Sequence, residues 1–448
     1  MIRRAARRTL GSARVLSLLA SQRRIGHASP ETFANQRDSR VRDVIRYAAN
    51  SVPWYQDMFR QQRIDPRDIA SATGLEQLPI LDKGDVRVSP DAFRAQTLEG
   101  KRAIPFKTSG TTGEPLIVYH DPGSIVSNFA YCEPEKQVVA EILGRRRDIR
   151  QLAIISMPAT LHRIWGVYRD WSFIPVPSEQ SLVPVETSIG DAVDHINQAR
   201  PTVLSGYGSY LETLFRYVAA NDIKMHRPKL VSYAADAITD VGQELIRNEF
   251  GIPLISRYSS VESFRIGFTC PEYNGFHIRS DICHLRVVDE NGQNVPAGHS
   301  GEIIISNLVN RGTVLLNYRL GDRGVISKSA CPCGRPMPLL SELEGRAEDV
   351  VTLESGQTVH PRAIWRLIGG HSRVVRYQLI QREINRFELR LVTVDSSDFN
   401  DLAAQLSIEL RQLLRGAQID CVCLDSIPVP PGGKFRPVIS LHSTEGRG

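Results

Sequence analysis

Hydrophobic residues follow two different periods along this chain, and the positions where the period changes divide it into parts. In residues 41–49, apolar side chains recur every three or four positions, which predicts a helix that ends before Pro53. A loop is predicted at 79–82, followed by a second short helix and a polar loop at 107–115. The N-terminal third therefore begins with helices joined by loops.

From about residue 151, short apolar runs alternate with helical patterns. The predicted strands are 152–157, 202–206, 229–234 and 252–258, and the predicted helices are 191–199, 210–221 and 240–250. Strands separated by helices of this length predict a parallel sheet with crossover helices. After residue 270 the pattern changes to antiparallel hairpins, with strands at 284–288 and 301–306 and a turn at 290–292.

A change in composition near residues 344–349 marks a domain boundary. The roughly 100 residues beyond it suffice for a small α+β domain, with strands near 350, 377–381 and 386–394 and a helix at 398–415. The predicted division is a basic leader at 1–30, a large domain at 31–346 and a small C-terminal domain at 347–448.

The positive charge of the chain is concentrated at its start. The 448 residues carry a net charge of +6, and residues 1–30 hold seven Arg and no Asp or Glu. We interpret this segment as a flexible basic leader; the alternative is an organelle transit peptide, of which an acid-free, Arg-rich start is also typical. Elsewhere the charge is roughly balanced, with no basic stripe interleaved with aromatics, so no nucleic-acid partner is predicted.

The overall composition is that of a globular protein without membrane spans. Hydrophobic residues make up 42% and charged residues 23%, and no run approaches the roughly 20 apolar residues of a membrane-spanning helix. The seven cysteines are too few and too scattered for a disulfide framework. This favours a reducing compartment, and a cytoplasmic location is predicted.

The polar loop at 108–115 is the first candidate for chemistry. Its candidate ligand-binding residues are Thr108, Ser109, Gly110, Thr111, Thr112 and Gly113. The glycines allow close approach to a ligand, while the hydroxyls and backbone N–H groups suit an anion such as the β- and γ-phosphates of ATP. The Gly-Lys-Ser/Thr ending of a Walker loop is absent, and a short run of this kind is by itself also compatible with a polar surface turn.

Four further motifs give this loop a context. The loop resembles the phosphate loop of the adenylate-forming superfamily of acyl-CoA ligases, luciferases and peptide-synthetase adenylation domains. The later motifs resemble that superfamily's aromatic-Gly-x-x-Glu, Tyr-x-x-Gly-Asp, Gly-Arg-x-x-Asp and Gly-Lys elements, in the family's order, at 258–262, 318–322, 345–349 and 432–436. The resemblance implies an α/β fold: a large N-terminal domain of mixed or parallel sheets with helices and a β-rich subdomain, and a small α+β C-terminal domain on a hinge.

Within the superfamily, the chain resembles most the phenylacetate–CoA ligases and their capsule-biosynthesis-like relatives. Residues 52–55 precede 78–83 as in that subgroup's N-terminal pair of motifs, and no Lys follows Pro115. Residues 331–335, Cys-Pro-Cys-Gly-Arg, lie between the Gly-Asp and Gly-Arg motifs. The resemblance covers about residues 40–440.

The resemblance assigns roles to residues of a nucleotide site. Glu262 would bind Mg²⁺, which takes one or two carboxylates together with substrate phosphates. Asp322 would accept hydrogen bonds from both ribose hydroxyls, Arg346 would contact the ribose or a phosphate, and Tyr258 would stack near the adenine. Taken singly, the carboxylates could equally be surface or turn residues, and the aromatic ring could be core.

Two residues near or within the small domain are assigned to catalysis and domain movement. Lys434 is the candidate cation for the transition state of acyl-AMP formation; its alternative is an exposed loop Lys. Glu348 occupies the hinge position, which is commonly Asp in the family. About this point the C-terminal domain of relatives swings between adenylation and thioester formation.

Two segments depart from the family pattern. Ser259 replaces the common Gly of its motif, so the backbone there is predicted to be less tightly turned. Residues 232–236, Ser-Tyr-Ala-Ala-Asp, resemble the adenine-pocket segment, in which Gly and Glu are more usual. Individual roles within 232–236 are therefore left open.

A second metal site is predicted from cysteine and histidine. Cys270, His277, Cys331 and Cys333 supply three thiols and one imidazole, the ligand set of a structural tetrahedral zinc site. The two pairs flank part of the β-rich segment, so a zinc ion would clip its ends together, and some relatives share these positions. Against this, Cys-x-Cys is tighter than the usual spacing, and buried free cysteines are the alternative.

The predicted function is activation of a small carboxylic acid with ATP and Mg²⁺, followed by transfer of the acyl group to CoA. An acid pocket is predicted within residues 130–260, where the aromatic residues Trp165, Tyr168, Trp171, Phe173 and Tyr207 cluster. Several of these rings are expected to be core residues, and the cluster is compatible with an aromatic or otherwise apolar acid without identifying it. The alternatives are transfer to an amine, a hydroxyl or a carrier-protein thiol, and a nucleotide-binding pseudoenzyme. Whether the protein is a homodimer is left open.

Overall fold

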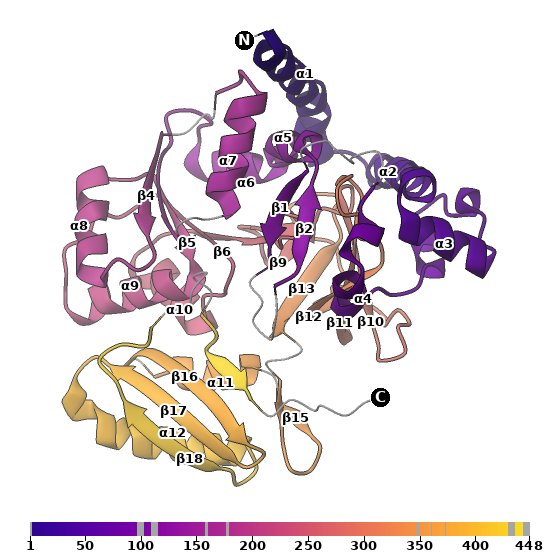
Figure 1. Ribbon diagram of the computed structural model, residues 1–448. Coiled ribbons are helices and arrows are strands. Elements are labelled where there is room, and N and C mark those ends of the chain that lie inside the picture. Colours follow the sequence, from indigo (N-terminus) through magenta and orange to yellow (C-terminus); the bar gives the residue numbers. More distant parts are fainter. Residues whose placement is uncertain are drawn as a thin grey trace.

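The computed structural model describes residues 2–95, 103–108, 115–156, 160–175, 179–346, 350–359, 361–371, 373–428 and 435–441. The chain forms a large N-terminal part and a small C-terminal part, which lies at the bottom of Figure 1. The predicted fold class, α/β with a separate small α+β domain, is confirmed.

One sheet of eleven strands, in the order β10-β11-β12-β13-β9-β8-β7-β6-β5-β3-β4, runs through the large part. Its parallel half consists of β3 (Arg150–Ile155), β4 (Glu179–Pro184), β5 (Val203–Tyr207), β6 (Leu230–Ala234) and β7 (Leu254–Tyr258). Its antiparallel half consists of β8 (Gly267–Cys270), β9 (Tyr273–Ile278), β10 (Cys283–Val288), β11 (Ser300–Asn307), β12 (Tyr318–Ile326) and β13 (Leu339–Arg346). Because β7 pairs in parallel with β6 and antiparallel with β8, the α/β and hairpin segments share one sheet.

Helices connect the parallel strands as the spacing predicts. They are α8 (Ile189–Ala199), α9 (Gly208–Ala220) and α10 (Asp240–Glu244), which continues into a wider turn at Leu245–Glu249, whereas α6 (Glu133–Leu143) leads into β3. Ser188 and Thr239 cap α8 and α10, since their hydroxyl oxygens accept backbone N–H bonds from Asp191 and Gly242. The buried faces of these strands and helices form one apolar core, which includes Ile154 and Phe215.

Three helices cover the antiparallel half: α2 (Pro30–Ser51), α3 (Pro53–Gln62) and α4 (Lys83–Val88). The predicted helix at 41–49 is the second half of α2, which begins after Ser29, whose hydroxyl accepts from the Thr32 backbone N–H at 3.1 Å. Buried side chains of α2 and α3 share a core with β10, β11 and β12. Short 3₁₀ turns lie at Pro66–Asp68, Thr73–Gln77 and Pro90–Phe93.

Residues 2–25 differ from the flexible leader predicted for 1–30. Residues Ile2–Ile25 form helix α1, which packs against α5 (Pro122–Tyr131) and α7 (Thr160–Trp171). Gly11 lies so close to α7 that a Cβ added there would be 1.8 Å from the Trp171 carbonyl oxygen. Gln22 is fully buried, and its side-chain oxygen accepts a 2.6 Å bond from the Arg279 guanidinium.

Several arginines of α1 are matched by acids and aromatics elsewhere in the chain, which the local composition does not reveal. Arg4 pairs with Asp170 at 3.1 Å, and the Arg7 guanidinium lies over the Trp171 ring. A segment without acids can therefore pack as a helix, because its counter-charges come from distant residues. No helix in the described part of the chain has both the length and the apolarity needed to cross a membrane.

The small part is a second domain with its own core. Its sheet has the order β18-β17-β16-β19, formed by β16 (Val374–Glu383), β17 (Arg386–Thr393), β18 (Gln418–Cys423) and β19 (Val438–Ser440). Helices α11 (Pro361–Gly369) and α12 (Phe399–Leu413), a 3₁₀ turn at Ser396–Asp398 and a hairpin of β14 (Val351–Thr352) and β15 (Thr358–Val359) complete it.

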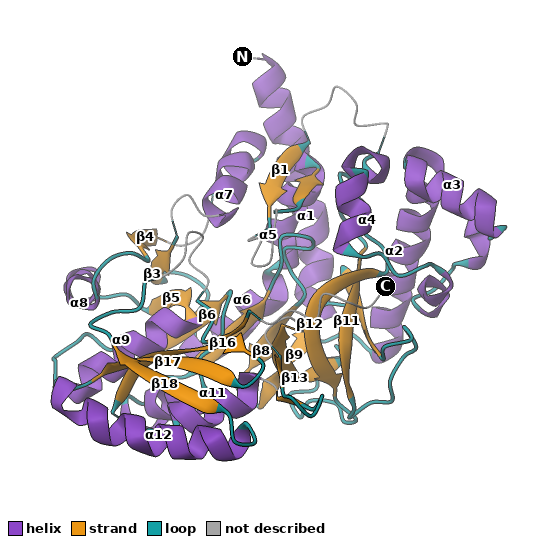
Figure 2. Cartoon of the chain, turned by 60° about the horizontal axis from the view of Figure 1, so that its bottom comes forward, coloured by secondary structure: helices purple, strands orange, loops and turns teal. Residues whose placement is uncertain are grey.

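Helix α9 of the large part lies against the sheet of the small domain (Figure 2). The Arg216 guanidinium on α9 donates to the carbonyl oxygen of Gly369, the last residue of α11, at 2.9 Å. Arg216 is itself held by Glu212 at 2.9 Å, and the Glu212 carboxylate also accepts from the Thr239 backbone N–H. The two domains are therefore in direct polar contact.

Candidate active site

A cavity of about 510 Å³ lies between the two domains, within the size range of small-molecule sites. Its walls include the carboxyl ends of β6 and β7, where ligands of open α/β sheets bind, together with β12, β13 and the small domain. Four residues predicted from the sequence line it: Thr108, Tyr258, Glu262 and Asp322. Motifs separated by more than 200 residues therefore meet at one site.

Tyr258 and Asp322 form a hydrogen-bonded pair in this cavity. Tyr258 ends β7, and its hydroxyl donates to the Asp322 carboxylate on β12 at 2.7 Å. Its ring is buried and packs beside Phe276. The tyrosine predicted to stack near a base therefore also fixes the orientation of the carboxylate predicted to bind the ribose.

Glu262 lies in the turn that follows β7. Its side chain borders the cavity, and the residue is only 8% exposed. The Glu262 carbonyl oxygen accepts a 2.8 Å bond from the Asn307 side-chain amide at the end of β11. The backbone beneath the predicted metal ligand is therefore fixed by a buried side chain.

The 232–236 segment, whose residue roles the sequence left open, bends sharply into the cavity. Ala235 has a φ of 75°, a left-handed conformation that is uncommon for a residue with a Cβ. Asp236 follows, and its carboxylate accepts from the Ser209 hydroxyl at 2.6 Å and from the Ser209 backbone N–H. Burial raises the pKa of Asp236 to about 6. Hydrogen bonds from Ser209, Gly208 and the Phe435 backbone N–H act in the opposite direction and lower the pKa.

The small domain contributes its own wall to the cavity. Phe435, Arg376 and Arg436 line it, and the Arg376 guanidinium lies 4.0 Å from the Phe435 ring centre. The Phe435 N–H bonded to Asp236 directly follows Lys434 in the chain. The sequence offered no signal for Arg376, because an isolated arginine on a strand of another domain carries no motif.

Several predicted site residues lie outside the described residues: Ser109, Gly110, Thr111, Thr112 and Gly113 of the phosphate loop, Glu348 and Lys434. The residues at the two ends of the loop are described, and Thr108 at one end bonds to Leu116 at the other. The Thr108 backbone N–H donates to the Leu116 carbonyl, and the Thr108 hydroxyl accepts from the Leu116 N–H, both at 2.9 Å. The backbone of Arg346 pairs opposite Asp322 in the sheet, and its side chain lies outside the described structure.

The aromatic cluster predicted to form the acid pocket lies elsewhere. Of the five residues, Tyr168 stacks on Phe129 of α5, and the rings of Trp171 and Phe173 lie beneath arginines of α1. In the part of the chain that the structure describes, none of the five lines the cavity. The aromatic residues that do line it are Tyr233, Tyr258, Phe276, Tyr318, Trp365, Tyr377 and Phe435.

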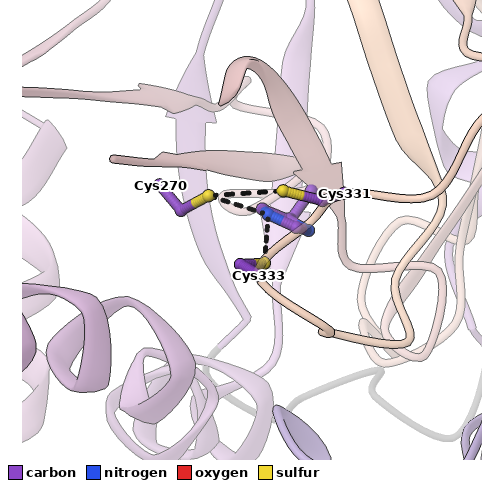
Figure 3. Close-up of side chains that lie close together, drawn as sticks. Cys270, Cys331 and Cys333 are labelled. Carbon is purple, nitrogen blue, oxygen red and sulfur yellow. Dashed lines mark hydrogen bonds between the residues drawn. The ribbon is translucent and has the colours of Figure 1, made fainter. Parts of the chain in front are cut away.

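Cys270, His277, Cys331 and Cys333 come together as the zinc prediction requires (Figure 3). Cys270 and His277 lie on β8 and β9, and the two other cysteines lie in the segment between β12 and β13. The Sγ atoms of Cys270 and Cys331 are 3.6 Å apart, and His277 Nε2 lies 3.3 Å from Cys270 Sγ and 3.4 Å from Cys333 Sγ.

These spacings fit a tetrahedral zinc site. Zn–S bonds of about 2.3 Å and Zn–N bonds of about 2.0 Å place two sulfurs roughly 3.8 Å apart and sulfur and nitrogen roughly 3.5 Å apart. Burial lowers the pKa of His277 to about 4, so its imidazole is neutral and able to act as a ligand. Burial opposes ionisation of the Cys333 thiol, but hydrogen bonds from Arg335 lower its pKa.

Comparisons with known proteins agree with this architecture. Residues 351–441 match the model of the CapK C-terminal domain family. The protein CapK of Staphylococcus aureus is 20% identical, over 89% of this chain and 87% of its own. The phenylacetate–coenzyme A ligase of Thermus thermophilus is 24% identical, over 81% of each chain.

A solved structure shows the same fold. The 2-hydroxyisobutyryl-CoA ligase in its postadenylation state, in complex with R3-HIB-AMP, has a TM-score of 0.76 over 94% of this chain and 92% of its own, at 16% identity. Against the same enzyme in its thioesterification state the TM-score is 0.60. The chain therefore has the fold of the adenylate-forming ligases and is a homologue of CapK and of the phenylacetate–coenzyme A ligases.

Proposed function

We propose that the protein activates a small carboxylic acid with ATP and transfers the acyl group to CoA. The observation that carries this proposal is the interdomain cavity, where Tyr258 and Glu262 of one motif meet Asp322 of another in an adenylate-forming fold. Homology to phenylacetate–coenzyme A ligases supports a ligase that forms a thioester through an acyl-AMP.

The proposed reaction has two steps. In the first, a carboxylate oxygen attacks the α-phosphorus of ATP, and the bond to the bridging oxygen breaks, releasing pyrophosphate and forming acyl-AMP. In the second, the CoA thiol loses its proton and attacks the acyl carbon, releasing AMP and forming the thioester. Catalysis in such reactions is mainly positioning and stabilisation of developing charge.

The residues of the cavity suit these steps. Asp322, oriented by Tyr258, would accept hydrogen bonds from the ribose hydroxyls, with Arg346 nearby on β13. Glu262 would supply a carboxylate oxygen to Mg²⁺, which neutralises phosphate charge when bound. The loop from Thr108 to Gly113 would hold the departing phosphates, and Lys434 would stabilise the transition state.

The second step is proposed to follow a rotation of the small domain about Glu348. Support comes from the domain arrangement: the chain superposes more closely on the postadenylation state of the 2-hydroxyisobutyryl-CoA ligase than on its thioesterification state.

An acceptor other than CoA, such as an amine, a hydroxyl or a carrier-protein thiol, would use the same first step. Pyrophosphate release should therefore be measured across a library of acids, with and without CoA. No release with any acid would refute the proposed function, and adenylation without thioester would exclude CoA.

Asp322→Asn is expected to raise the KM for ATP roughly 10- to 100-fold, because exchanging the charged acceptor for a neutral amide weakens the two ribose contacts by about 1–3 kcal/mol together. The amide retains the size of the side chain and can still accept from the Tyr258 hydroxyl, so the melting temperature should change little. Steady-state pyrophosphate release would measure the KM, with Asp57→Asn on the exposed face of α3 as control. An unchanged KM in Asp322→Asn would remove the ribose assignment.

We also propose that Cys270, His277, Cys331 and Cys333 bind a structural zinc ion, which would tie the β8–β9 hairpin to the segment leading into β13. Protein purified without chelator is expected to contain about one equivalent of zinc by elemental analysis. Cys270→Ser should lose most of the metal and lower the melting temperature. Cys132→Ser, which changes a buried cysteine outside the cluster, should keep it. Less than a tenth of an equivalent in the wild type would refute the site.

A further inference from the structure

We propose that His120 is a positioning residue for Glu262: it fixes the backbone beneath the metal-binding carboxylate and joins it to the hairpin that carries the phosphate loop. The inference rests on the proposed function, in which Glu262 binds the metal that accompanies ATP. His120 itself does not line the interdomain cavity among the residues described there, so it acts through Glu262 rather than on the substrate.

The contact between His120 and the Glu262 turn is direct. His120 is the last residue of β2 (Ile117–His120), is 1% exposed, and its Nε2 lies 2.8 Å from the Val261 carbonyl oxygen. A carbonyl can only accept, so the ring carries its proton on Nε2 and donates. Burial lowers the pKa of His120 to about 4, which keeps the imidazole neutral at physiological pH and consistent with a single Nε2–H donor.

The turn that His120 holds is strained. Phe264 has a φ of 62°, an outlier for a bulky residue, and its backbone N–H donates to the Ser260 carbonyl at 2.7 Å. The His120 ring stacks on the Phe264 ring at 3.9 Å between centroids and 17° between planes, and Phe106 meets both rings edge-on. A strained conformation persists only where its surroundings determine it, and this stack supplies that constraint.

Two buried side chains thus hold the carbonyls on successive residues of the turn. His120 binds the Val261 oxygen, and the Asn307 amide binds the Glu262 oxygen at 2.8 Å. The Asn307 side-chain oxygen is used as well, since it accepts from the backbone N–H groups of Val309 and Asn310. Because hydrogen bonds hold the carbonyl groups of both Val261 and Glu262, the backbone that carries the Glu262 carboxylate is fixed in one position.

His120 also connects this turn to the phosphate loop. It pairs with Ile104 across the hairpin of β1 (Ile104–Lys107) and β2, whose far ends lead into Thr108 and Leu116. The hairpin is anchored where Gly312 approaches it: a Cβ on Gly312 would lie 2.2 Å from the Tyr119 carbonyl oxygen. His120 therefore links the hairpin whose far ends lead into the loop to the turn that carries Glu262.

The test separates the two contacts of His120. His120→Phe keeps the aromatic ring for stacking but removes the donor, whereas His120→Gln keeps a donor at the Nε2 position but removes the ring. His226→Phe is the matched control, because His226 also contacts a backbone carbonyl, that of Pro201 at 3.0 Å, away from the cavity. Calorimetry would measure the affinity for ATP in the presence of Mg²⁺ and in the presence of EDTA. This measurement requires no acid substrate, and thermal unfolding of each variant would be followed in parallel.

The wild type is expected to bind ATP more tightly with Mg²⁺ than with EDTA. In His120→Phe this metal-dependent gain should fall by about tenfold while binding in EDTA stays within about twofold, as expected for one lost hydrogen bond acting on the metal ligand. His120→Gln should recover most of the gain, and His226→Phe should keep all of it. Thioester formation from supplied acyl-AMP and CoA, which releases no pyrophosphate, should be unaffected in every variant.

Two results would overturn the inference: an unchanged metal-dependent gain in His120→Phe, or an equal loss of binding with and without Mg²⁺, which would indicate a merely structural role. A wild type that binds Mg²⁺–ATP but releases no pyrophosphate with any acid would instead remove the proposed function and leave the His120 inference standing. If neither His120 variant folds, Asn307→Asp, which presents an acceptor to the Glu262 carbonyl, must reproduce the selective loss, and failure to do so counts against the inference.

Discussion

Lys434→Ala is expected to slow acyl-AMP formation by about 10²–10³-fold while leaving thioester formation from supplied acyl-AMP near the wild-type rate. In the first step negative charge builds up on the α-phosphoryl oxygens and the departing pyrophosphate, and one preorganised donor in such a site is typically worth about this factor. The proposed rotation of the small domain would carry Lys434 away before the second step. The adjacent Phe435 lines the cavity, and its backbone N–H reaches Asp236 of the large domain. The residue that follows Lys434 in the chain therefore meets the proposed nucleotide site.

The two half-reactions would be measured separately on the same preparations, as pyrophosphate release and as thioester formed from acyl-AMP and CoA. Lys328→Ala, which removes an exposed lysine between β12 and β13, is the control and should match the wild type in both. An equal loss of both steps in folded Lys434→Ala would contradict a role confined to adenylation. It would also count against the proposed rotation about Glu348.

Removal of α1 is expected to destabilise the protein by at least about 4 kcal/mol. Val15 and Ile25 are 2% exposed, and burial of such side chains contributes about 1.5–3 kcal/mol each. Loss of Gln22 would also leave a donor of the fully buried Arg279 without its acceptor, at a cost of about 1–3 kcal/mol. Solubility, yield and thermal unfolding of a chain beginning at residue 26 would measure the effect.

Point variants keep this prediction testable if the truncated chain does not fold. Gly11→Val places a side chain against the Trp171 carbonyl and should cost roughly 1–3 kcal/mol, whereas Ala13→Val on the exposed side of the same helix should cost well under 1 kcal/mol. Equal stabilities of the two variants, or a wild-type melting temperature for the truncated chain, would show that α1 is only loosely attached.

Sequence reasoning succeeded where the physics is local. The predicted alternation of strands and helices between residues 150 and 258 is observed. Short apolar runs separated by helical patterns are compatible with few other arrangements of secondary structure. The motifs carrying Tyr258 and Asp322 converge because each lies at the end of, or within, a strand of one sheet. The cysteine and histidine spacing likewise placed the predicted ligands together.

The misplaced features depend on contacts between distant segments. Residues 2–25 have no local sign of packing, since the partners of their arginines include Asp170 and Trp171. Tyr168 and Trp171 of α7 resemble pocket residues by composition, but they pack against α1. Asp236 and Arg376 come into proximity only because the small domain docks on the large one. No period or motif in a single segment records such docking.

The left-handed conformation of Ala235 has a consequence for laboratory evolution of this protein. Alanine at positive φ costs about 1 kcal/mol relative to glycine, which adopts that conformation freely. Any alanine codon becomes a glycine codon through a single base change, so selection for heat resistance would sample this exchange early. The same exchange would make the cavity wall next to Asp236 more flexible. Alanine to glycine at residue 235 would therefore raise thermal stability and lower the precision with which the proposed site binds a nucleotide.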